Sequence, residues 1–313
     1  MKNLPKKFYQ RLENIYSKNE IETILNWLNT QKRKVSFRVN HLKSNSREIE
    51  EVLKQNNIDF TKKEFLNDSY ILNSWREKDL WDLEIFKDWK IYMQSISSQI
   101  PVLFLDLKTW NRVLDVTSAP WSKTSQIADI LNNSWEIIAN DNNAIRIDKL
   151  KFTLNRQWVT NTQVIKNDAR NLSKTLEKQS FDSILADLPC SAEWRINLNN
   201  EKSFWFWSEE NILKNASLQK EILSDIVPLL KRDWVLVYST CTLAIEENEE
   251  VVEFILNKFP NLKLEEVNLD YKFVKKWITN YGEKSFNTEI SKTLRCLPSD
   301  ETEWFYIAKF KKL

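Results

Sequence analysis

Residues 112–140 read RVLDVTSAPWSKTSQIADILNNSWEIIAN. This stretch begins with a short apolar run, Arg112–Val116, and ends with a second one, Glu136–Asn140. Between them lie a turn-rich polar loop and a segment with helical spacing of apolar residues over about Lys123–Leu131. Two parallel strands need a crossover between them, usually a helix. The stretch therefore predicts one strand–helix–strand unit of a parallel sheet.

The same alternation continues towards the C-terminus. Further strands are predicted at Thr162–Ile165, Phe181–Ala186 and Trp234–Tyr238. Helices are predicted to run through Leu154, over about Glu209–Leu230 and over Glu246–Phe259. The final apolar runs, Thr293–Leu297 and Phe305–Phe310, are predicted to pair antiparallel. This pattern indicates an α/β fold with a doubly wound, mostly parallel sheet, in which ligands bind at the carboxyl ends of the strands.

The first 90 residues follow a different pattern. Residues 5–29 have the apolar spacing of two short helices, and Lys34–Asn40 alternates like a strand. We expect Ser46 to cap a helix to about Gln55, with further strands at Ile58–Phe60 and Ser69–Leu72. The chain is therefore divided into a small α+β module, residues 1–90, and a larger α/β domain, residues 91–313.

Composition excludes several classes of protein. Three cysteines in a chain without an apolar signal segment indicate reduced thiols and a cytoplasmic location. No apolar run approaches the roughly 18 residues of a membrane span. His41 is the only histidine, which argues against a histidine-ligated metal and against a Ser-His or Cys-His mechanism. The net charge of +2 does not demand a nucleic-acid partner, and the lysine-rich stretches fit either solvated surface or an RNA footprint.

Glycine is unusually rare in this sequence, and tryptophan is unusually frequent. The 313 residues include 1 glycine and 14 tryptophans, whereas average usage of about 7% would give roughly 22 glycines. Glycine is the default residue where φ is positive or the backbone approaches a ligand closely. We therefore expect many of the tryptophans to stand where the natural protein has glycine. A UGA codon, which some bacterial lineages translate as glycine and others as tryptophan, would account for both anomalies.

Acidic residues follow the predicted parallel strands in step. Asp115, Asp141, Asp168 and Asp187 lie at or just after the ends of four successive strands. Strand ends are often polar, so each aspartate alone has a structural explanation. Together they would line one crevice, where carboxylates can accept hydrogen bonds from a ribose and an adenine amine. The set favours a nucleoside-containing cofactor.

Two cysteines also follow predicted strands. Cys190 lies in the segment DLPC that starts at Asp187, and Cys241 lies in YSTCT just past the fifth strand. A lone cysteine is usually a small buried apolar residue. Two at neighbouring strand ends, one of them near an aspartate, indicate covalent chemistry, because a thiolate is a strong nucleophile without a histidine partner.

Three motifs then carry a specific resemblance. Residues 117–124 (TSAPWSKT) resemble C-A-A-P-G-[GS]-K-T, and residues 187–195 (DLPCSAEWR) resemble D-A-P-C-S-G-x-G-R. Residues 238–249 (YSTCTLAIEENE) resemble Y-S-T-C-T-x-x-x-E-E-N-E. These are motifs of the NOL/NOP/Sun family of RNA (cytosine-5) methyltransferases, and weaker likenesses extend over nearly the whole chain. The resemblance implies a Rossmann-like methyltransferase fold.

The resemblance also implies a cofactor and a site. The cofactor is S-adenosyl-L-methionine, with Asp141 at its ribose, Asp168 at its adenine edge and Asp187 where cofactor and target base meet. The methionine part would be wrapped by the loop residues Thr117, Ser118, Ala119, Pro120, Trp121, Ser122 and Lys123. No metal is implied. Lys123 and Arg195 are candidates for phosphate or base contacts, with surface salt bridges as an equal alternative.

The implied reaction forms 5-methylcytosine. Cys241 would attack C6 of an unstacked cytosine in RNA, Cys190 would assist proton removal or adduct breakdown, and Asp187 would stabilise the adduct. Ribosomal RNA is placed before transfer RNA as substrate, and a monomer is the simplest expectation. Two alternatives stay open: a non-catalytic RNA-binding relative with a degraded cofactor pocket, and an unrelated nucleotide-binding oxidoreductase.

The motifs identify the positions at which glycine is expected. Eight tryptophans fall where the family pattern has glycine: Trp89, Trp110, Trp121, Trp135, Trp158, Trp194, Trp234 and Trp304. Trp207 matches a family tryptophan, and five others have no assignment: Trp27, Trp75, Trp81, Trp205 and Trp277. A bulky residue at a φ > 0 turn costs about 1–3 kcal/mol. We expect the chain as spelled to fold poorly and to be inactive, and the glycine-restored chain to be active.

Overall fold

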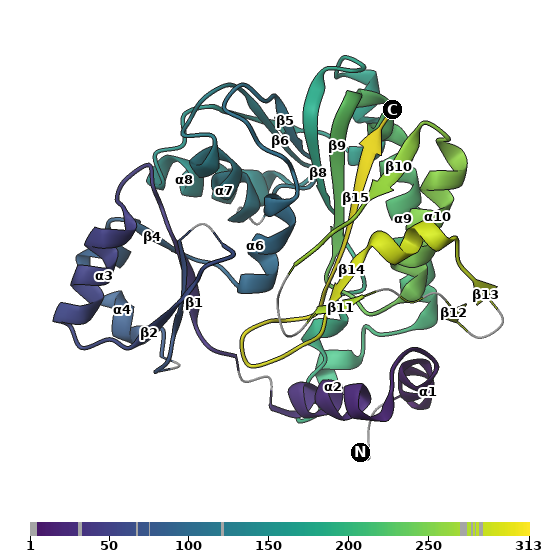
Figure 1. Ribbon diagram of the computed structural model, residues 1–313, viewed down its shortest axis with the longest axis horizontal. Helices are drawn as coiled ribbons and strands as arrows, with labels where there is room; N and C mark the ends of the chain where they lie inside the picture. Colours follow the sequence, from purple (N-terminus) through teal and green to yellow (C-terminus); the bar gives the residue numbers. More distant parts are fainter. Residues whose placement is uncertain are drawn as a thin grey trace.

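The computed structural model describes residues 5–30, 33–66, 68–74, 76–119, 122–269, 274–276, 278, 280–281 and 284–313. A small antiparallel sheet with its helices lies beside a large mixed sheet that is covered by helices (Figure 1). The large sheet has the strand order β11-β14-β15-β9-β8-β5-β6-β7, and β10 also pairs with β15.

The large sheet confirms the predicted doubly wound topology. Its parallel strands are β5 (Val113–Asp115), β6 (Ile137–Asp141), β7 (Thr162–Lys166), β8 (Phe181–Asp187) and β9 (Leu230–Thr240). The chain starts at the central β5, moves outward to β6 and β7, and returns to β8 on the other side of β5. The β5–β8 boundary is thus the point where the winding reverses, which is where such sheets bind ligands.

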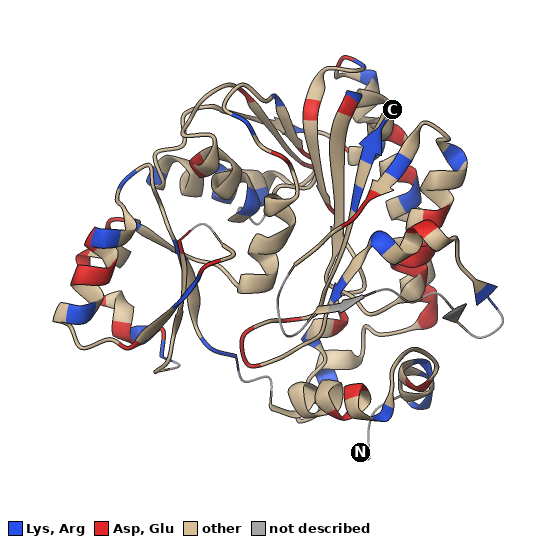
Figure 2. Ribbon diagram, in the orientation of Figure 1, with Lys and Arg blue, Asp and Glu red and all other residues tan. Residues whose placement is uncertain are grey.

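The remaining strands of the sheet are antiparallel. They are β10 (Leu262–Glu265), β11 (Val274–Lys276), β14 (Leu294–Cys296) and β15 (Phe305–Lys312). The predicted pairing of the last two runs is confirmed, with Leu294 opposite Ile307. A separate pair is formed by β12 (Asn280–Tyr281) and β13 (Lys284–Ser285). Figure 2 shows basic residues on β15 near the C-terminus, where Lys309 pairs with Asp106 and Glu265 instead of lying free.

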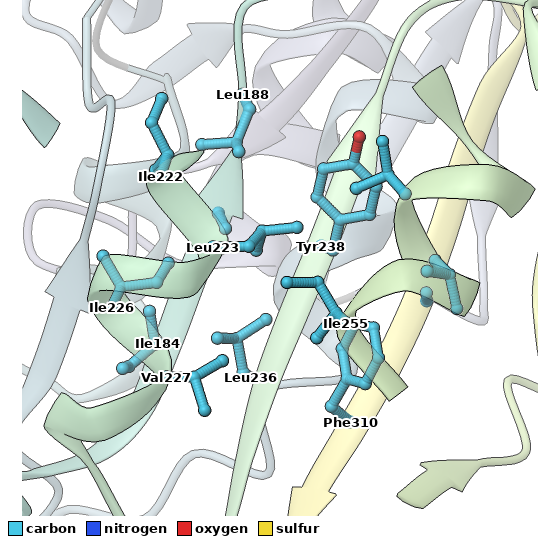
Figure 3. Packing of buried hydrophobic residues seen from close by; sticks show 14 of the residues in the cluster. Ile184, Leu188, Ile222, Leu223, Ile226, Val227, Leu236, Tyr238, Ile255 and Phe310 are labelled. Atoms are coloured by element: carbon cyan, nitrogen blue, oxygen red, sulfur yellow. The ribbon is translucent and has the colours of Figure 1, made fainter. Parts of the chain in front are cut away.

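Helices cover both faces of this sheet (Figure 1). One side carries α6 (Ile96–Leu103), α7 (Ser122–Ile130) and α8 (Ala144–Arg156), and the other carries α9 (Glu209–Ile226) and α10 (Glu249–Lys258). Strand side chains alternate between the two faces. On β9, Leu236 and Tyr238 pack with α9 and α10 (Figure 3), whereas Val237 belongs to the core beneath α6 and α7. The two cores together hold the strand ends in place.

The N-terminal sheet has the order β2-β3-β1-β4 and is antiparallel throughout. Its strands are β1 (Ser36–Val39), β2 (Phe60–Lys63), β3 (Ser69–Leu72) and β4 (Ile91–Met93), with helices α3 (Ser46–Gln55), α4 (Lys78–Trp81) and α5 (Glu84–Lys87) beside them. The predicted cap of α3 was wrong. Asn45 is the cap, because its side chain accepts from the Glu48 amide, and Ser46 is the first helical residue.

The first two helices pack away from this small sheet. Helices α1 (Lys6–Ile15) and α2 (Lys18–Thr30) contribute residues such as Phe8 and Ile24 to a core that also contains Trp207 and Leu243 of the larger unit. The ring centroids of Phe8 and Trp207 are 5.5 Å apart in an edge-on arrangement. Residues 5–30 therefore support the segment just past β9, which is the segment that carries Cys241.

Candidate active site

A cavity of about 580 Å³ lies at the carboxyl ends of β5, β6 and β7. Three of the predicted site residues line it, Thr117, Asp141 and Asp168. The other lining residues include Asn140, Asn142, Arg146, Asn167, Ala169, Arg170, Pro189, Lys214, Asn215, Leu218, Glu221 and Ile222. The structure therefore brings the second and third strand-end aspartates to one cavity, as their positions in the sequence predict.

Both of these aspartates have cationic neighbours in the cavity wall. The Asp141 side chain is 3% exposed; it accepts from the Asn143 amide and lies 3.2 Å from Nη2 of Arg146. Asp168 pairs with Arg170 at 2.6 Å, and the hydrogen bonds from that guanidinium lower the pKa of Asp168. The wall thus offers two carboxylate acceptors, each with an arginine side chain beside it.

The loop after β5 is fastened to the neighbouring strands. Thr117 donates its hydroxyl to the Asp187 carbonyl at 2.6 Å, and Ser118 donates both its amide and its hydroxyl to the Asn140 carbonyl at 2.8 and 2.9 Å. The Ala119 carbonyl accepts from Arg146. Ser122 begins α7. The predicted residues Pro120 and Trp121 lie outside the described residues.

Asp187 connects this loop to the neighbouring strand β9. One carboxylate oxygen accepts from Nζ of Lys123 at 2.6 Å, and the other accepts from the Ser239 hydroxyl at 2.8 Å. The Lys123 side chain is 10% exposed and also donates to Ser98. Lys123 was a candidate for a phosphate or base contact, and in the structure its ammonium group forms an ion pair with Asp187. Arg195, the other candidate, is exposed, with its guanidinium over the Phe206 ring.

Asp115 does not line the cavity. It is 1% exposed and accepts a hydrogen bond from the Thr124 hydroxyl at 2.6 Å. Burial raises the pKa of Asp115 to about 7. Asp115 therefore supports the start of α7. Asp187, the fourth member of the strand-end set, does not line this cavity either; it lies at the Lys123–Ser239 contact described above.

The two predicted cysteines meet between β8 and β9. Their Sγ atoms are 3.1 Å apart, although Cys190 follows one strand and Cys241 follows the other. Both side chains are partly exposed. The hydrogen bond with Cys241, together with burial, raises the pKa of the Cys190 thiol well above its usual value. Cys296 lies buried in β14, where burial raises its pKa to about 12, so it is an inert thiol.

Three further polar residues lie beneath the cysteines and were not predicted as site residues. Glu193, Glu247 and Asn248 are each 2% exposed or less. The run Glu246–Glu250 suggests an acidic helix N-terminus, but α10 begins only at Glu249, and Glu247 points inward. Burial raises the pKa of Glu247 to about 8. The signal in the sequence is the position of these residues inside the DLPCSAEWR and EENE motifs.

Two classes of feature are absent from the part of the chain that the structure describes. Within it, no three His, Cys, Asp or Glu side chains are grouped so that they could hold a metal ion. No helix of those described residues has the length and apolar character needed to span a membrane.

Comparisons with known proteins agree with this geometry. The family model "16S rRNA methyltransferase RsmB/F" matches residues 102–311. A tRNA (cytosine(49)-C(5))-methyltransferase of Pyrococcus abyssi is 38% identical over 283 residues, 88% of this chain and 88% of the relative. A human 28S rRNA (cytosine(4447)-C(5))-methyltransferase is 36% identical over 229 residues, 70% of this chain but 27% of that longer protein.

A solved structure extends the likeness to the whole fold. A methyltransferase homolog protein from Pyrococcus horikoshii superimposes with a TM-score of 0.86 and 28% identity, covering 99% of this chain and 96% of that one. The match includes the N-terminal helices and small sheet as well as the large sheet. The chain therefore belongs to the RsmB/F family of RNA cytosine-C5 methyltransferases.

Proposed function

We propose that the chain transfers a methyl group from S-adenosyl-L-methionine to C5 of a cytosine in RNA through a covalent adduct between Cys241 and C6. The observation that carries this proposal is the 3.1 Å separation of the Cys190 and Cys241 Sγ atoms, beside Asp187. Cytosine C5 is a weak nucleophile, and addition of a thiolate at C6 places electron density on C5. Elimination of the thiolate, after loss of the C5 proton, restores the aromatic ring.

The two thiols are assigned different roles. The hydrogen bond with Cys241 and burial raise the pKa of the Cys190 thiol, which makes Cys190 the poorer candidate for the attacking thiolate. The attack is therefore assigned to Cys241, as the motif resemblance implies. Cys190 then assists removal of the C5 proton or breakdown of the adduct. Asp187 is proposed to accept a hydrogen bond from the exocyclic amine of the base. Its orientation is held by Lys123 and the Ser239 hydroxyl.

The cavity residues fit the cofactor that the resemblance implies. S-adenosyl-L-methionine, when bound, supplies a methyl group on a positively charged sulfur. Asp141 would accept from the ribose hydroxyls, Asp168 would contact the adenine edge, and the loop Thr117–Lys123 would enclose the methionine part. The cavity has a volume of about 580 Å³ and is lined by carboxylates. Carboxylates can attract the positively charged sulfur of the cofactor and accept hydrogen bonds from its two ribose hydroxyls. Asp141, which now lies 3.2 Å from Nη2 of Arg146, would exchange that contact for the ligand's hydroxyls.

The proposed substrate is RNA, and residues 1–90 are proposed to be the module that binds it. Ribosomal RNA is the first candidate, because the matching family model is named for 16S rRNA. Transfer RNA is the second, because the relative matched over 88% of both chains is named for tRNA. The small sheet extends past residue 90, since β4 (Ile91–Met93) pairs with β1.

We also infer that tryptophan replaces a natural glycine at the eight positions named above. Three of them have the positive φ that favours glycine: Trp89 (60°), Trp135 (57°) and Trp158 (63°). Ala192, where the family motif has glycine, also has a positive φ of 53°. Trp110, Trp194, Trp234 and Trp304 do not. The indole nitrogen of Trp304 is buried without a hydrogen-bond partner, an unfavourable position for a natural tryptophan.

One assay tests these proposals together. The chain as spelled and the chain with the eight glycines are each incubated with tritiated S-adenosyl-L-methionine and with purified ribosomal RNA or transfer RNA lacking the modification. We expect 5-methylcytosine with the glycine-restored chain and almost none with the chain as spelled. No counts in either RNA would reject the proposed function. The glycine assignment has a separate test in the gene. If the suspect codons are UGG and not UGA, that assignment is rejected and the proposed function is unaffected.

A further inference from the structure

A continuous chain of buried hydrogen bonds connects the loops that carry the two cysteines. Ser191, directly after Cys190, and Thr242, directly after Cys241, have their hydroxyl oxygens 2.8 Å apart. Thr242 Oγ1 also lies 2.8 Å from Oε2 of Glu193. These three residues are between 1% and 2% exposed. No role in the reaction has been given to any of them above.

The direction of these hydrogen bonds follows from the acceptors. Glu193 accepts from the Trp207 indole at 2.8 Å and from the Leu243 amide at 2.9 Å, so its carboxylate acts as an acceptor. Thr242 must then use its single hydroxyl hydrogen on Glu193. Ser191 is left as the donor to Thr242. The bridge therefore runs in one direction, from Ser191 through Thr242 to Glu193, and no hydroxyl in it can rotate away without losing a buried hydrogen bond.

Each loop is also held from the side of α10. The Ser191 amide donates to the Glu247 carboxylate at 3.0 Å. Asn248 accepts from the Thr240 hydroxyl at 2.5 Å and donates to the Thr242 carbonyl at 3.0 Å, so it holds both neighbours of Cys241. The Asn248 contacts fix the loop after β9, and the Glu247 contact joins the Ser191 backbone to the segment that follows β9. The Ser191–Thr242 contact is the direct side-chain link between the residues that follow the two cysteines.

We propose that the hydroxyl bridge from Ser191 through Thr242 to Glu193 is the positioning device that sets the separation of the Cys190 and Cys241 thiols for methyl transfer. The inference rests on the roles proposed above for the two cysteines. Ser191, Thr242 and Glu193 do not contact the reacting atoms in this proposal. They act through the backbone of the two loops, in addition to the bonds from the Leu243 amide to Glu193 and from the Ser191 amide to Glu247.

Thr242 provides a matched set of variants in the glycine-restored chain of 313 residues. T242V keeps the shape of the side chain but removes the hydroxyl, and T242S restores it. T293V is the control for loss of a buried threonine hydroxyl elsewhere, because Thr293 is 2% exposed and donates to the Ile290 carbonyl at 2.8 Å. S191A breaks the same bridge from the other end without adding bulk, in case T242V fails to fold.

The first readout measures thiol spacing without relying on activity. Diamide oxidises two thiols to a disulfide and takes up their two electrons and two protons, and peptide mass spectrometry follows the Cys190–Cys241 product. Because closure depends on the approach geometry of the sulfurs, we expect T242V and S191A to form it about tenfold more slowly than the parent. T242S and T293V should match the parent. T242V oxidising at the rate of T293V would overturn the proposal.

The second readout is a kinetic split. A positioning role predicts that kcat of T242V falls about tenfold while KM for RNA stays within about twofold, with T242S recovering most of kcat. An increase in KM at unchanged kcat would also overturn the proposal, because it would place Thr242 in RNA binding. If the parent transfers no methyl group, the proposed function fails, but the disulfide rates still decide whether the bridge sets the thiol spacing.

Discussion

The Sγ atoms of Cys190 and Cys241 lie 3.1 Å apart, although 51 positions separate the two residues in the chain. They meet because β8 and β9 are adjacent parallel strands, with Asp187 opposite Ser239 in the register. Cys190 lies three residues past the end of β8 and Cys241 directly follows β9, so the shared edge of the sheet brings both thiols to the same side. At this separation both thiols can reach the same cytosine, which fits the proposed roles of Cys241 as nucleophile and Cys190 in proton removal or adduct breakdown.

The two cysteines should give different phenotypes when replaced by serine. We expect C241S to lose methyl transfer by about three orders of magnitude, because a serine hydroxyl is a far weaker nucleophile. C190S should instead accumulate a covalent protein–RNA adduct, seen as a retarded band on a denaturing gel. C296A is the control, since Cys296 is buried in β14. An adduct with C241S and none with C190S would reverse the assignment.

Loss of the Asp187 carboxylate should destabilise the site as well as abolish transfer. D187N removes the counter-charge of Lys123, whose side chain is 10% exposed and pairs with Asp187 at 2.6 Å. We expect a loss of about 2 kcal/mol in the free energy of unfolding. The double variant K123M/D187N should recover part of this stability, because it leaves no buried charge unpaired, but it should not recover methyl transfer. Urea denaturation and the tritium assay check the two expectations.

Glycine at three tryptophan positions should stabilise the chain. W89G, W135G and W158G each relieve a positive φ, and each should raise the free energy of unfolding by about 1–3 kcal/mol. W110G is the matched control: Trp110 is 58% exposed, comparable to Trp135 at 62%, but its φ is not positive. Thermal and denaturant unfolding of the four single variants measures the difference. Equal effects at Trp110 and Trp135 would contradict the backbone explanation.

Stability should depend on pH through the single histidine. His41 lies between Asp129 (3.0 Å) and Asp68 (2.9 Å), and its hydrogen bond to the Asp129 carboxylate raises the pKa of His41 to about 8. Because this value exceeds the unfolded value of about 6.5, the stabilisation is fully present below that pH and is lost as pH rises through 8. His41 is 35% exposed on its side chain, so solvent screening reduces the effect.

The H41Q variant isolates this contribution. At about pH 6 we expect it to be less stable than the parent by about 1 kcal/mol, and above about pH 9 the difference should disappear. The comparison between variant and parent removes the contributions of Asp115 and Glu247, which also have raised pKa values. Chemical denaturation at the two pH values provides the measurement. A difference that is constant with pH would show that the histidine contributes only by packing.

Most of the large sheet could be predicted from local patterns in the sequence. The five parallel strands and the helices between them follow from runs and spacings of apolar residues, and the structure confirms them to within a few residues. The start of α10 could not be predicted, because Glu247 and Asn248 resemble the first turn of a helix by composition. The Glu247 side chain instead accepts from the Ser191 amide, 56 positions away, and the Asn248 side chain accepts from the Thr240 hydroxyl, 8 positions back.

Local patterns in the sequence were enough to identify the residues at the strand ends, since a strand and the residues that follow it are neighbours in the chain. They placed Asp141, Asp168, Asp187, Cys190 and Cys241 at such ends. Which of these residues meet, that Asp115 is buried, and that Ser191 contacts Thr242 became visible only in the folded chain. Those outcomes depend on strand order and register, which are set by packing between segments far apart in the chain.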